Sequence, residues 1–169
     1  MTTIRITGLK EAQAALIELG SDLKAEIDKA VNITAFELQK DLQKRISAPG
    51  TGTTYYRIYD EKTGFTSIFA GDSEGYVTSV YGRLNLSATH RASKAGEAPA
   101  SDSGALLRSI YLNRVDGGTV VVGSKLLYAA WLEYGTRKIA PRPAWRPAAL
   151  LAQTAFTQRL KEALARAAR

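Results

Sequence analysis

The feature that most constrains this fold is an apolar stripe within residues 21–46. Six aliphatic side chains recur at helical spacing, and Lys, Glu and Asp residues lie between them: Leu23, Ile27, Val31, Leu38, Leu42 and Ile46. This period places the six on one face of a long helix and the charged residues on the other. Ser21 fits the start of the helix, and Pro49-Gly50 ends it. Its apolar face must be covered by another layer.

The rest of the chain predicts both further helices and an antiparallel sheet. Asp116-Gly117-Gly118 separates two β-prone runs and predicts a β-hairpin. The remaining expected elements are a strand over 2–7, a helix over 9–19, a helical turn over 104–108, a helix over 126–134 and a final helix with Pro147 in its first turn. The fold class is therefore α+β, an antiparallel sheet packed by the long N-terminal amphipathic helix and a C-terminal helix in a single domain of residues 1–169.

Residues 50–87 differ in character from the rest and predict an inserted, tyrosine-rich β-hairpin arm followed by a long loop over 83–103. Five of the eight tyrosines of the chain lie between residues 50 and 82. Tyrosine offers a large contact area at a low cost in conformational entropy, which favours an interface with another subunit or partner over a small self-contained sheet. The arm residues expected at that interface are Tyr55, Tyr56, Tyr59, Phe65, Tyr76 and Tyr81.

The segment 127–147 combines aromatic residues, a Gly-Thr turn and three prolines. Trp131 and Trp145 lie beside helical apolar positions, which favours packing in the core over ligand binding. Together with Glu133 they are also expected residues of the interface with another subunit or partner. We interpret Glu133 as a structural carboxylate paired with Arg137 or Arg142. The segment is expected to set the direction of the last helix.

The formal net charge of +7 is concentrated in the last third of the chain. Residues 117–169 hold nine basic residues and two acidic ones, whereas residues 1–47 and residues 48–116 each hold equal numbers of basic and acidic residues. Such a segment can face DNA or an acidic partner, or it can be a solvated helix face. The candidate contacts are Arg91, Lys94, Arg159, Lys161 and Arg166. A basic nucleic-acid-binding module is the alternative reading of the chain.

No set of residues predicts catalysis, a metal site or a cofactor. His90 is the only histidine, and the absence of cysteine excludes thiolate chemistry and disulfides. The acidic pairs Asp60/Glu61 and Asp72/Glu74 lie in expected turns, so a hydrolase with an unrecognised carboxylate pair is a remote third reading. No apolar run is long enough to span a bilayer, and a membrane is not an expected partner.

Several short motifs nevertheless follow one another in an order that is similar to that in a known protein family. They are Gly8-Leu9-Lys10 before the long helix, the loop at 96–110 with Ser103-Gly104-Ala105-Leu106, the run 120–123, Glu133-Tyr134-Gly135-Thr136, and Pro141-Arg142-Pro143 before the last helix. In this order they resemble the head–tail joining or tail-completion proteins of long-tailed bacteriophages, also described as neck proteins or minor tail components. The resemblance covers roughly residues 8–47 and 88–165 and does not reach the arm.

The resemblance implies a structural virion protein and not an enzyme. Its members form α+β subunits of a homo-oligomeric ring, six- or twelve-fold, at the neck or tail end. The ring would join connector, stopper and tail tube proteins and leave a channel for phage DNA. The implied location is the virion, with assembly in the host bacterial cytoplasm. A ring requires two different complementary surfaces on each subunit, here expected to be the arm and the segment 127–145.

Overall fold

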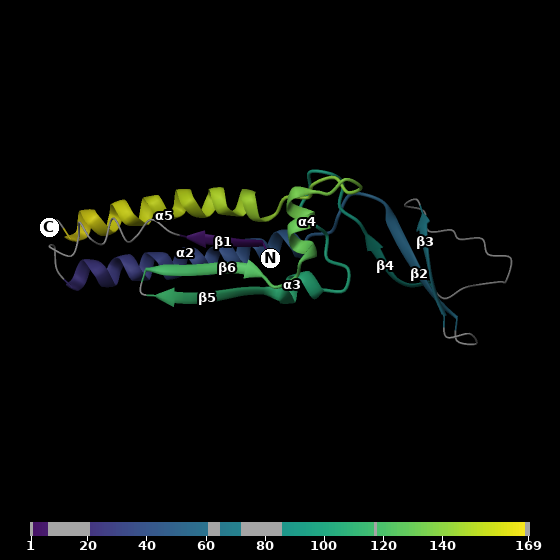
Figure 1. The fold of residues 1–169 in the computed structure, drawn as a ribbon, viewed down its shortest axis with the longest axis horizontal. Coiled ribbons are helices and arrows are strands. Elements are labelled where there is room, and N and C mark those ends of the chain that lie inside the picture. Colours follow the sequence, from purple (N-terminus) through teal and green to yellow (C-terminus); the bar gives the residue numbers. More distant parts are fainter. Residues whose placement is uncertain (1, 7–20, 61–64, 72–85, 117, 168–169) are drawn as a thin grey trace.

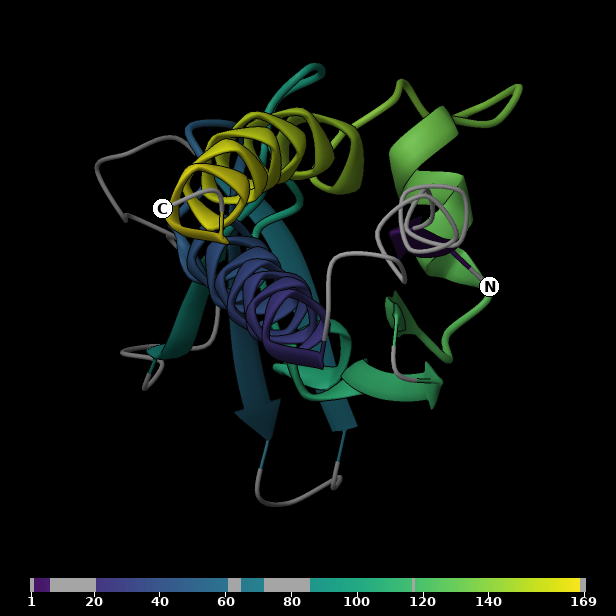
Figure 2. The same cartoon turned by 90° about the vertical axis from the view of Figure 1, so that its left-hand side faces the viewer.

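The fold is built around two long helices that run side by side along an elongated body (Figure 1). The structure is a computed structural model, and it describes residues 2–6, 21–60, 65–71, 86–116 and 118–167. The two helices are α2 (Ser21–Ser47) and α5 (Trp145–Ala167). The view along the body shows α5 stacked on α2, with a shorter helix to one side (Figure 2). The expected helix over 9–19 lies outside the described residues.

A three-stranded antiparallel sheet supplies the second layer. Its strands are β1 (Thr2–Ile6), β5 (Ile110–Asp116) and β6 (Thr119–Ser124), in the order β1-β6-β5. The hairpin predicted at 116–118 joins β5 to β6, and Asp116 lies opposite Thr119. The N-terminal strand pairs with β6 across the chain, Thr2 opposite Ser124.

The core lies between this sheet and the two helices. All six residues of the predicted stripe of α2 are at most 2% exposed, so the expectation from their spacing is confirmed. They pack against Val120 and Val122 of the sheet and against Trp145 and Ala148 of α5. Burial of this many aliphatic side chains is the main source of stability, at about 25 cal/mol per Å² of apolar surface removed from water.

Two short helices occupy the end of the body. Helix α3 (Ala105–Ser109) precedes β5, and α4 (Tyr128–Tyr134) follows β6. Both were predicted. Helix α4 crosses the direction of the long helices at the end of the body next to the arm (Figure 1).

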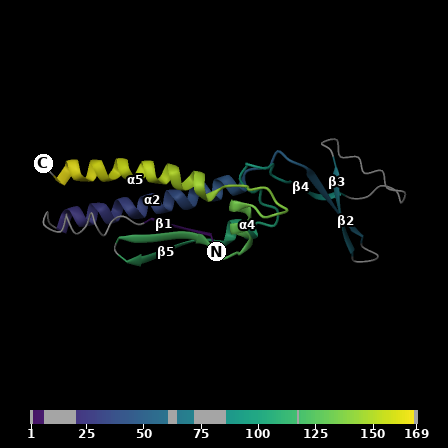
Figure 3. The ribbon, with the colours of Figure 1, turned by 45° about the horizontal axis from the view of Figure 1, so that its top comes forward.

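The inserted region forms a separate three-stranded antiparallel sheet that projects from one end of the body (Figure 3). Its strands are β2 (Thr54–Asp60), β3 (Phe65–Gly71) and β4 (Leu86–Arg91), in the order β3-β2-β4. The arm was therefore predicted, but its third strand was not. Strand β4 lies where a loop was expected and extends the arm beyond residue 87, because β2 supplies it with backbone partners such as Tyr55 opposite His90. The α+β class is confirmed.

Candidate assembly surfaces

The buried carboxylate of Glu133 joins α4 to the start of α5. Glu133 is 3% exposed. Its Oε2 accepts the backbone N–H groups of Ala144 and Trp145 at 2.7 and 3.0 Å, and Oε1 accepts that of Arg146 at 2.8 Å. The expected pairing with Arg137 or Arg142 is wrong, because the carboxylate binds backbone donors instead. The expectation of a structural role agrees with this geometry.

This arrangement satisfies the first turn of α5 completely. The initial N–H groups of a helix have no partner within it, and the N-terminal end of the helix dipole favours a negative charge. Glu133 takes three of these donors. Pro147 has no N–H, and the N–H of Ala148 binds the carbonyl of Ala144 at 3.3 Å. A side chain from another helix therefore serves as the N-cap.

The chain between the two helices is held in a tight turn. Gly135 has a φ of 77°, and a Cβ there would lie 2.9 Å from the carbonyl oxygen of Ile139. The N–H of Arg142 then binds the carbonyl of Leu132 at 2.6 Å. These contacts fix the direction in which α5 leaves the corner.

The opposite side of α4 is apolar and faces solvent. Leu127, Trp131 and Tyr134 are 67%, 55% and 66% exposed. They are spaced i, i+4 and i+7, so they form one line along the helix, which we call the α4 ridge. Trp131 is thus available to a partner as predicted, and its expected packing in the core is wrong. Trp145 is 1% exposed and packs in the core, so it is not a contact residue.

The arm offers fewer described contact residues than the sequence predicted. Tyr55 is 36% exposed, but Tyr56 is 5% exposed and packs within the fold, so the expectation that Tyr56 is a contact residue is wrong. Tyr59 and Phe65 lie on adjacent strands, opposite Thr66 and Asp60 respectively. Tyr76 and Tyr81 lie outside the described residues.

Two glycines bring the outgoing and returning chains of the arm into contact. A Cβ on Gly50 would lie 2.2 Å from the carbonyl oxygen of Ala92, and one on Gly52 would lie 2.7 Å from the same atom. The N–H of Gly52 binds that oxygen at 2.7 Å. Arg91 adds a hydrogen bond from Nε to the carbonyl of Gly52 at 3.2 Å. Arg91, a candidate DNA contact, therefore helps to close the base of the arm.

A second carboxylate, that of Glu97, clamps the base of the arm from the surface. It accepts the hydroxyl of Thr51, the N–H of Thr51 at 3.2 Å and the N–H of Lys94 at 2.9 Å. The Thr51 hydroxyl, followed by the Lys94 N–H, lowers the pKa of Glu97 below its usual value of 4.5. The next residue back, Gly96, donates its N–H to the carbonyl of Pro141 at 2.9 Å and ties this clamp to the α4–α5 corner.

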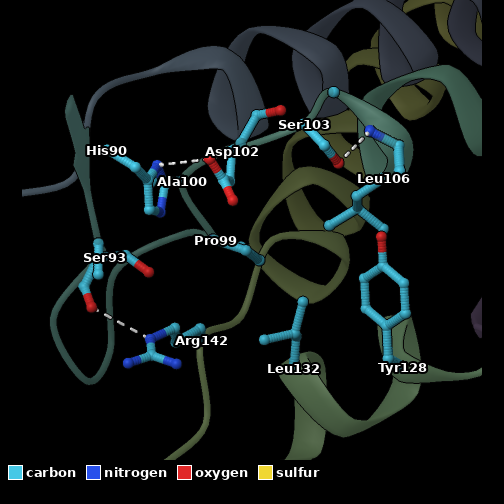
Figure 4. Close-up of a pocket in the computed structure, with 14 residues that line it drawn as sticks. His90, Ser93, Pro99, Ala100, Asp102, Ser103, Leu106, Tyr128, Leu132 and Arg142 are labelled. Carbon is cyan, nitrogen blue, oxygen red and sulfur yellow. Dashed lines mark hydrogen bonds and ion pairs between the residues drawn. The ribbon is translucent and has the colours of Figure 1, made fainter. Parts of the chain in front are cut away.

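A cavity of about 190 Å³ lies where the arm, α3 and α4 meet (Figure 4). His90 of β4 and Asp102 of the loop before α3 point toward one another, with Nδ1 and Oδ1 3.9 Å apart. Arg142 lies on the other side and donates from Nε to the carbonyl of Ser93 at 3.2 Å. Both contacts, His90–Asp102 and Arg142–Ser93, connect the arm or its base to the body. The polar residues of this cavity therefore hold the arm and the body together.

Intramolecular ion pairs engage two of the three basic residues predicted on the last helix. Arg159 binds both carboxylate oxygens of Glu37 at 2.6 and 2.7 Å, and Arg166 binds Glu26 at 2.9 Å. These contacts join α5 to α2. Lys161 is exposed and makes no ion pair with a described acidic residue. Two of the candidate DNA contacts on the last helix are thus neutralised by acidic residues of α2.

Sequence reasoning missed the residues at the base of the arm. Gly50, Gly52 and Glu97 carry no recognisable motif, and only the Gly-Thr-Gly run at 50–52 is a local signal of an unusual backbone. Among the described residues, no group of three or more His, Asp or Glu side chains is placed to hold a metal ion. Within the same residues, no helix has the length and apolar character to cross a membrane. Comparison of the chain with known protein families, with curated proteins and with solved structures finds no match.

Proposed function

We propose that this chain is a structural virion protein of the phage neck or tail end, which assembles as a ring around a channel for DNA. The observation that carries the proposal is the motif pair behind the resemblance. Glu133-Tyr134-Gly135-Thr136 and the residues after Pro141-Arg142-Pro143 form one structural unit, since the Glu133 carboxylate binds the N–H groups of Ala144, Trp145 and Arg146. Motifs that meet in this way share a structural task, which supports reading them together.

The shape of the subunit also supports assembly. A ring with head-to-tail contacts needs two different surfaces on each subunit. The arm projects from one end of the body and supplies one of them (Figure 1). Elsewhere on the body, Ile33 and Phe36 of α2 and Leu150 and Leu151 of α5 are between 40% and 61% exposed. Ile33 and Phe36 are three residues apart on α2 and therefore neighbours on its surface, so they form a candidate second surface of the ring.

Contacts at the base of the arm hold the arm in a fixed orientation relative to the body. Backbone contacts close it at Gly52 and Ala92, and Glu97 clamps Thr51 to Lys94. Through Gly96 and Pro141 it is tied to the α4–α5 corner. An arm held in this way presents its contact surface in a defined direction, which a closed ring requires.

An arm deletion tests the proposal. The N–H of Gly52 lies 2.7 Å from the carbonyl oxygen of Ala92, so residues 53–91 can be replaced by two glycines without displacing the body. A deletion confined to 53–81 would leave β4 without β2, its partner strand. We expect the full chain to form a uniform six- or twelve-fold ring in native mass spectrometry and negative-stain microscopy, and the armless chain to remain a folded monomer.

The matched control is Thr157→Ala, an exposed substitution on α5 that should leave the ring intact. A full chain that stays monomeric at high concentration, or an armless chain that still forms rings, would contradict the proposal. Salt-sensitive retention of DNA by the isolated monomer, lost when Arg159, Lys161 and Arg166 are neutralised together, would instead favour the nucleic-acid-binding alternative.

A further inference from the structure

The α4 ridge is an apolar surface that nothing in the chain's described residues covers. Leu127 and Tyr134 have the two largest exposed fractions among the described large apolar side chains, and Trp131 lies between them. Water contact with three such side chains in a line is unfavourable, and soluble proteins usually keep such patches for a partner. The opposite side of the same helix holds the buried Ala129 and Glu133. The ridge is therefore anchored to the rigid corner and cannot turn inward without breaking the cap of α5.

Positive charges surround the ridge. The guanidinium carbon of Arg146 lies 5.6 Å from the centre of the Tyr134 ring. Arg137 and Lys138 occupy the tip of the turn closed by the backbone pairs between Thr136 and Ile139, directly after the helix, and all four turn residues are exposed. Lys125 precedes the helix and is exposed as well.

No carboxylate of the same segment balances these charges. Glu133 is the only acidic residue between positions 117 and 161, and it is buried with both oxygens bound to backbone N–H groups. The ridge therefore presents apolar side chains within a positive rim. A partner that fills it must bring apolar groups for the ridge and carboxylates for the rim.

We propose that the α4 ridge docks an acidic amphipathic segment of a protein other than this chain. The spacing i, i+4 and i+7 matches the way one helix packs on another. A symmetric contact between the ridges of two copies does not fit, because two ridges face to face would bring two positive rims together. On α2, the carboxylates of Glu26, Glu37 and Asp41 are already engaged with Arg166, Arg159 and Arg45.

A nucleic acid or an anionic membrane would match the charge but not the apolar geometry. Stacking of bases needs open ring faces, whereas Arg146 already lies over Tyr134. Membrane affinity increases with the apolar area that is buried, and the ridge offers only three apolar side chains. The inference holds whether or not the chain forms rings. Within the proposed function it assigns the ridge to a neighbouring protein of the neck, in place of the ring contact expected from the sequence for the segment 127–145, and leaves ring contacts to other surfaces.

The test uses the full chain and two synthetic helical peptides. One carries Leu at i, i+4 and i+7 with Glu at its other charged positions, and the other replaces each Glu with Lys. Trp131 is the exposed one of the two tryptophans, so a docked peptide should shift its emission to the blue and protect it from acrylamide. We expect the acidic peptide to bind, with an affinity that falls as salt is added, and the lysine peptide not to bind.

Variants separate the ridge from other surfaces. Leu127→Ser should weaken binding of the acidic peptide at least about tenfold, as expected for an anchor residue. Changing Arg137 and Lys138 together to Gln should weaken it at low salt only. Leu151→Ser, at a residue 59% exposed on α5, should leave it unchanged, and thermal unfolding should verify that each variant is folded.

Four outcomes would overturn the proposal. They are equal binding of the two peptides, no binding of either, self-association of the chain that Leu127→Ser abolishes, and protection of Trp131 by oligo-dT or phosphatidylglycerol vesicles in preference to the acidic peptide. Ring formation by the Leu127→Ser variant is measured separately. If the unaltered chain forms rings and the Leu127→Ser variant does not, the ridge is a ring contact and its assignment to a different protein is wrong. If the unaltered chain forms no rings, only the proposed function is contradicted.

Discussion

Two carboxylates perform the same task in this protein under different conditions. Glu133 and Glu97 each bind backbone N–H groups where two segments of the chain must be joined. Glu133 does so in the core, 3% exposed, whereas Glu97 does so at the surface with water as a competitor. Burial makes the first joint strong and intolerant of change, because an unpaired buried donor regains nothing from solvent. The second joint should contribute less stability, because water can replace the carboxylate as acceptor for these N–H groups.

The largest expected effect comes from Glu133→Ala. The substitution leaves three N–H groups at the start of α5 without their acceptor and opens a space in the core, so it should lower the free energy of unfolding by about 3–5 kcal/mol. Chemical denaturation measures it. Glu133→Gln keeps one acceptor oxygen and should cost clearly less. A loss below about 1 kcal/mol for the alanine variant would show that the buried carboxylate is no stronger a joint than an exposed one.

The next effect tests the base of the arm through its backbone. In Gly50→Ala the new Cβ would lie 2.2 Å from the Ala92 carbonyl oxygen, so the outgoing and returning chains must separate. We expect a loss of about 1–3 kcal/mol, as for other overpacked sites. Faster hydrogen exchange of the Gly52 amide would locate the damage.

Gly96→Ala is the matched control. Its φ is 84° but nothing lies within 4 Å of the new Cβ, so only backbone strain of about 1 kcal/mol applies. Equal losses for the two variants would show that close approach of the chains does not explain Gly50.

A smaller effect is expected from the pH dependence of the Glu97 clamp. Its folded pKa is lowered, so the clamp contributes stability above the unfolded value near 4.5 and loses it as the pH falls through the lower folded value. Exchange of the Thr51 and Lys94 amides should therefore accelerate below about pH 4.5 relative to amides of α2. Glu97→Gln should show fast exchange already at neutral pH. A pH-independent ratio in the unaltered chain would mean that the carboxylate does not hold this joint.

The smallest expected effect concerns a third carboxylate, which binds a side chain instead of the backbone. Glu37 is half exposed and pairs with Arg159 across the two long helices. Ion pairs of this kind contribute about 0.2–1 kcal/mol, and Glu37→Gln should cost no more. A double-mutant cycle with Arg159→Gln, which also breaks the bond to the Thr34 hydroxyl, isolates the pair. A coupling energy above about 2 kcal/mol between Glu37 and Arg159 would show that burial and backbone contacts do not determine how much each carboxylate contributes to stability.

The elements with strong local signals were predictable from the sequence. The stripe of α2 has a clear helical period, and Asp116-Gly117-Gly118 specifies a hairpin, so both were predicted with nearly correct limits. Strand β4 reads Leu86-Ser87-Ala88-Thr89-His90-Arg91 and contains only one large apolar side chain, so its local strand signal is weak. Its strand conformation depends on pairing with β2, which is a tertiary contact.

The sites show the same division. Sequence reasoning identified Glu133 as structural but paired it with an arginine, because nothing local indicates that the start of another helix will supply backbone donors. The two tryptophans looked alike, and only the placement of α4 across the end of the body exposes Trp131 and leaves Trp145 in the core. The pairs of Arg159 and Arg166 join residues 122 and 140 positions apart, so the last helix looked more basic than the fold makes it.

The pairing of β1 with β6 has a consequence for how the chain is made. Thr2 lies opposite Ser124, so β1 gains its partner strand only after the whole stretch between β1 and β6 has been translated. Until then the apolar stripe of α2 also lacks β6 and α5, which cover it in the folded protein. We therefore expect the nascent chain to be a client of chaperones that hold apolar segments, and to fold late in synthesis as one unit.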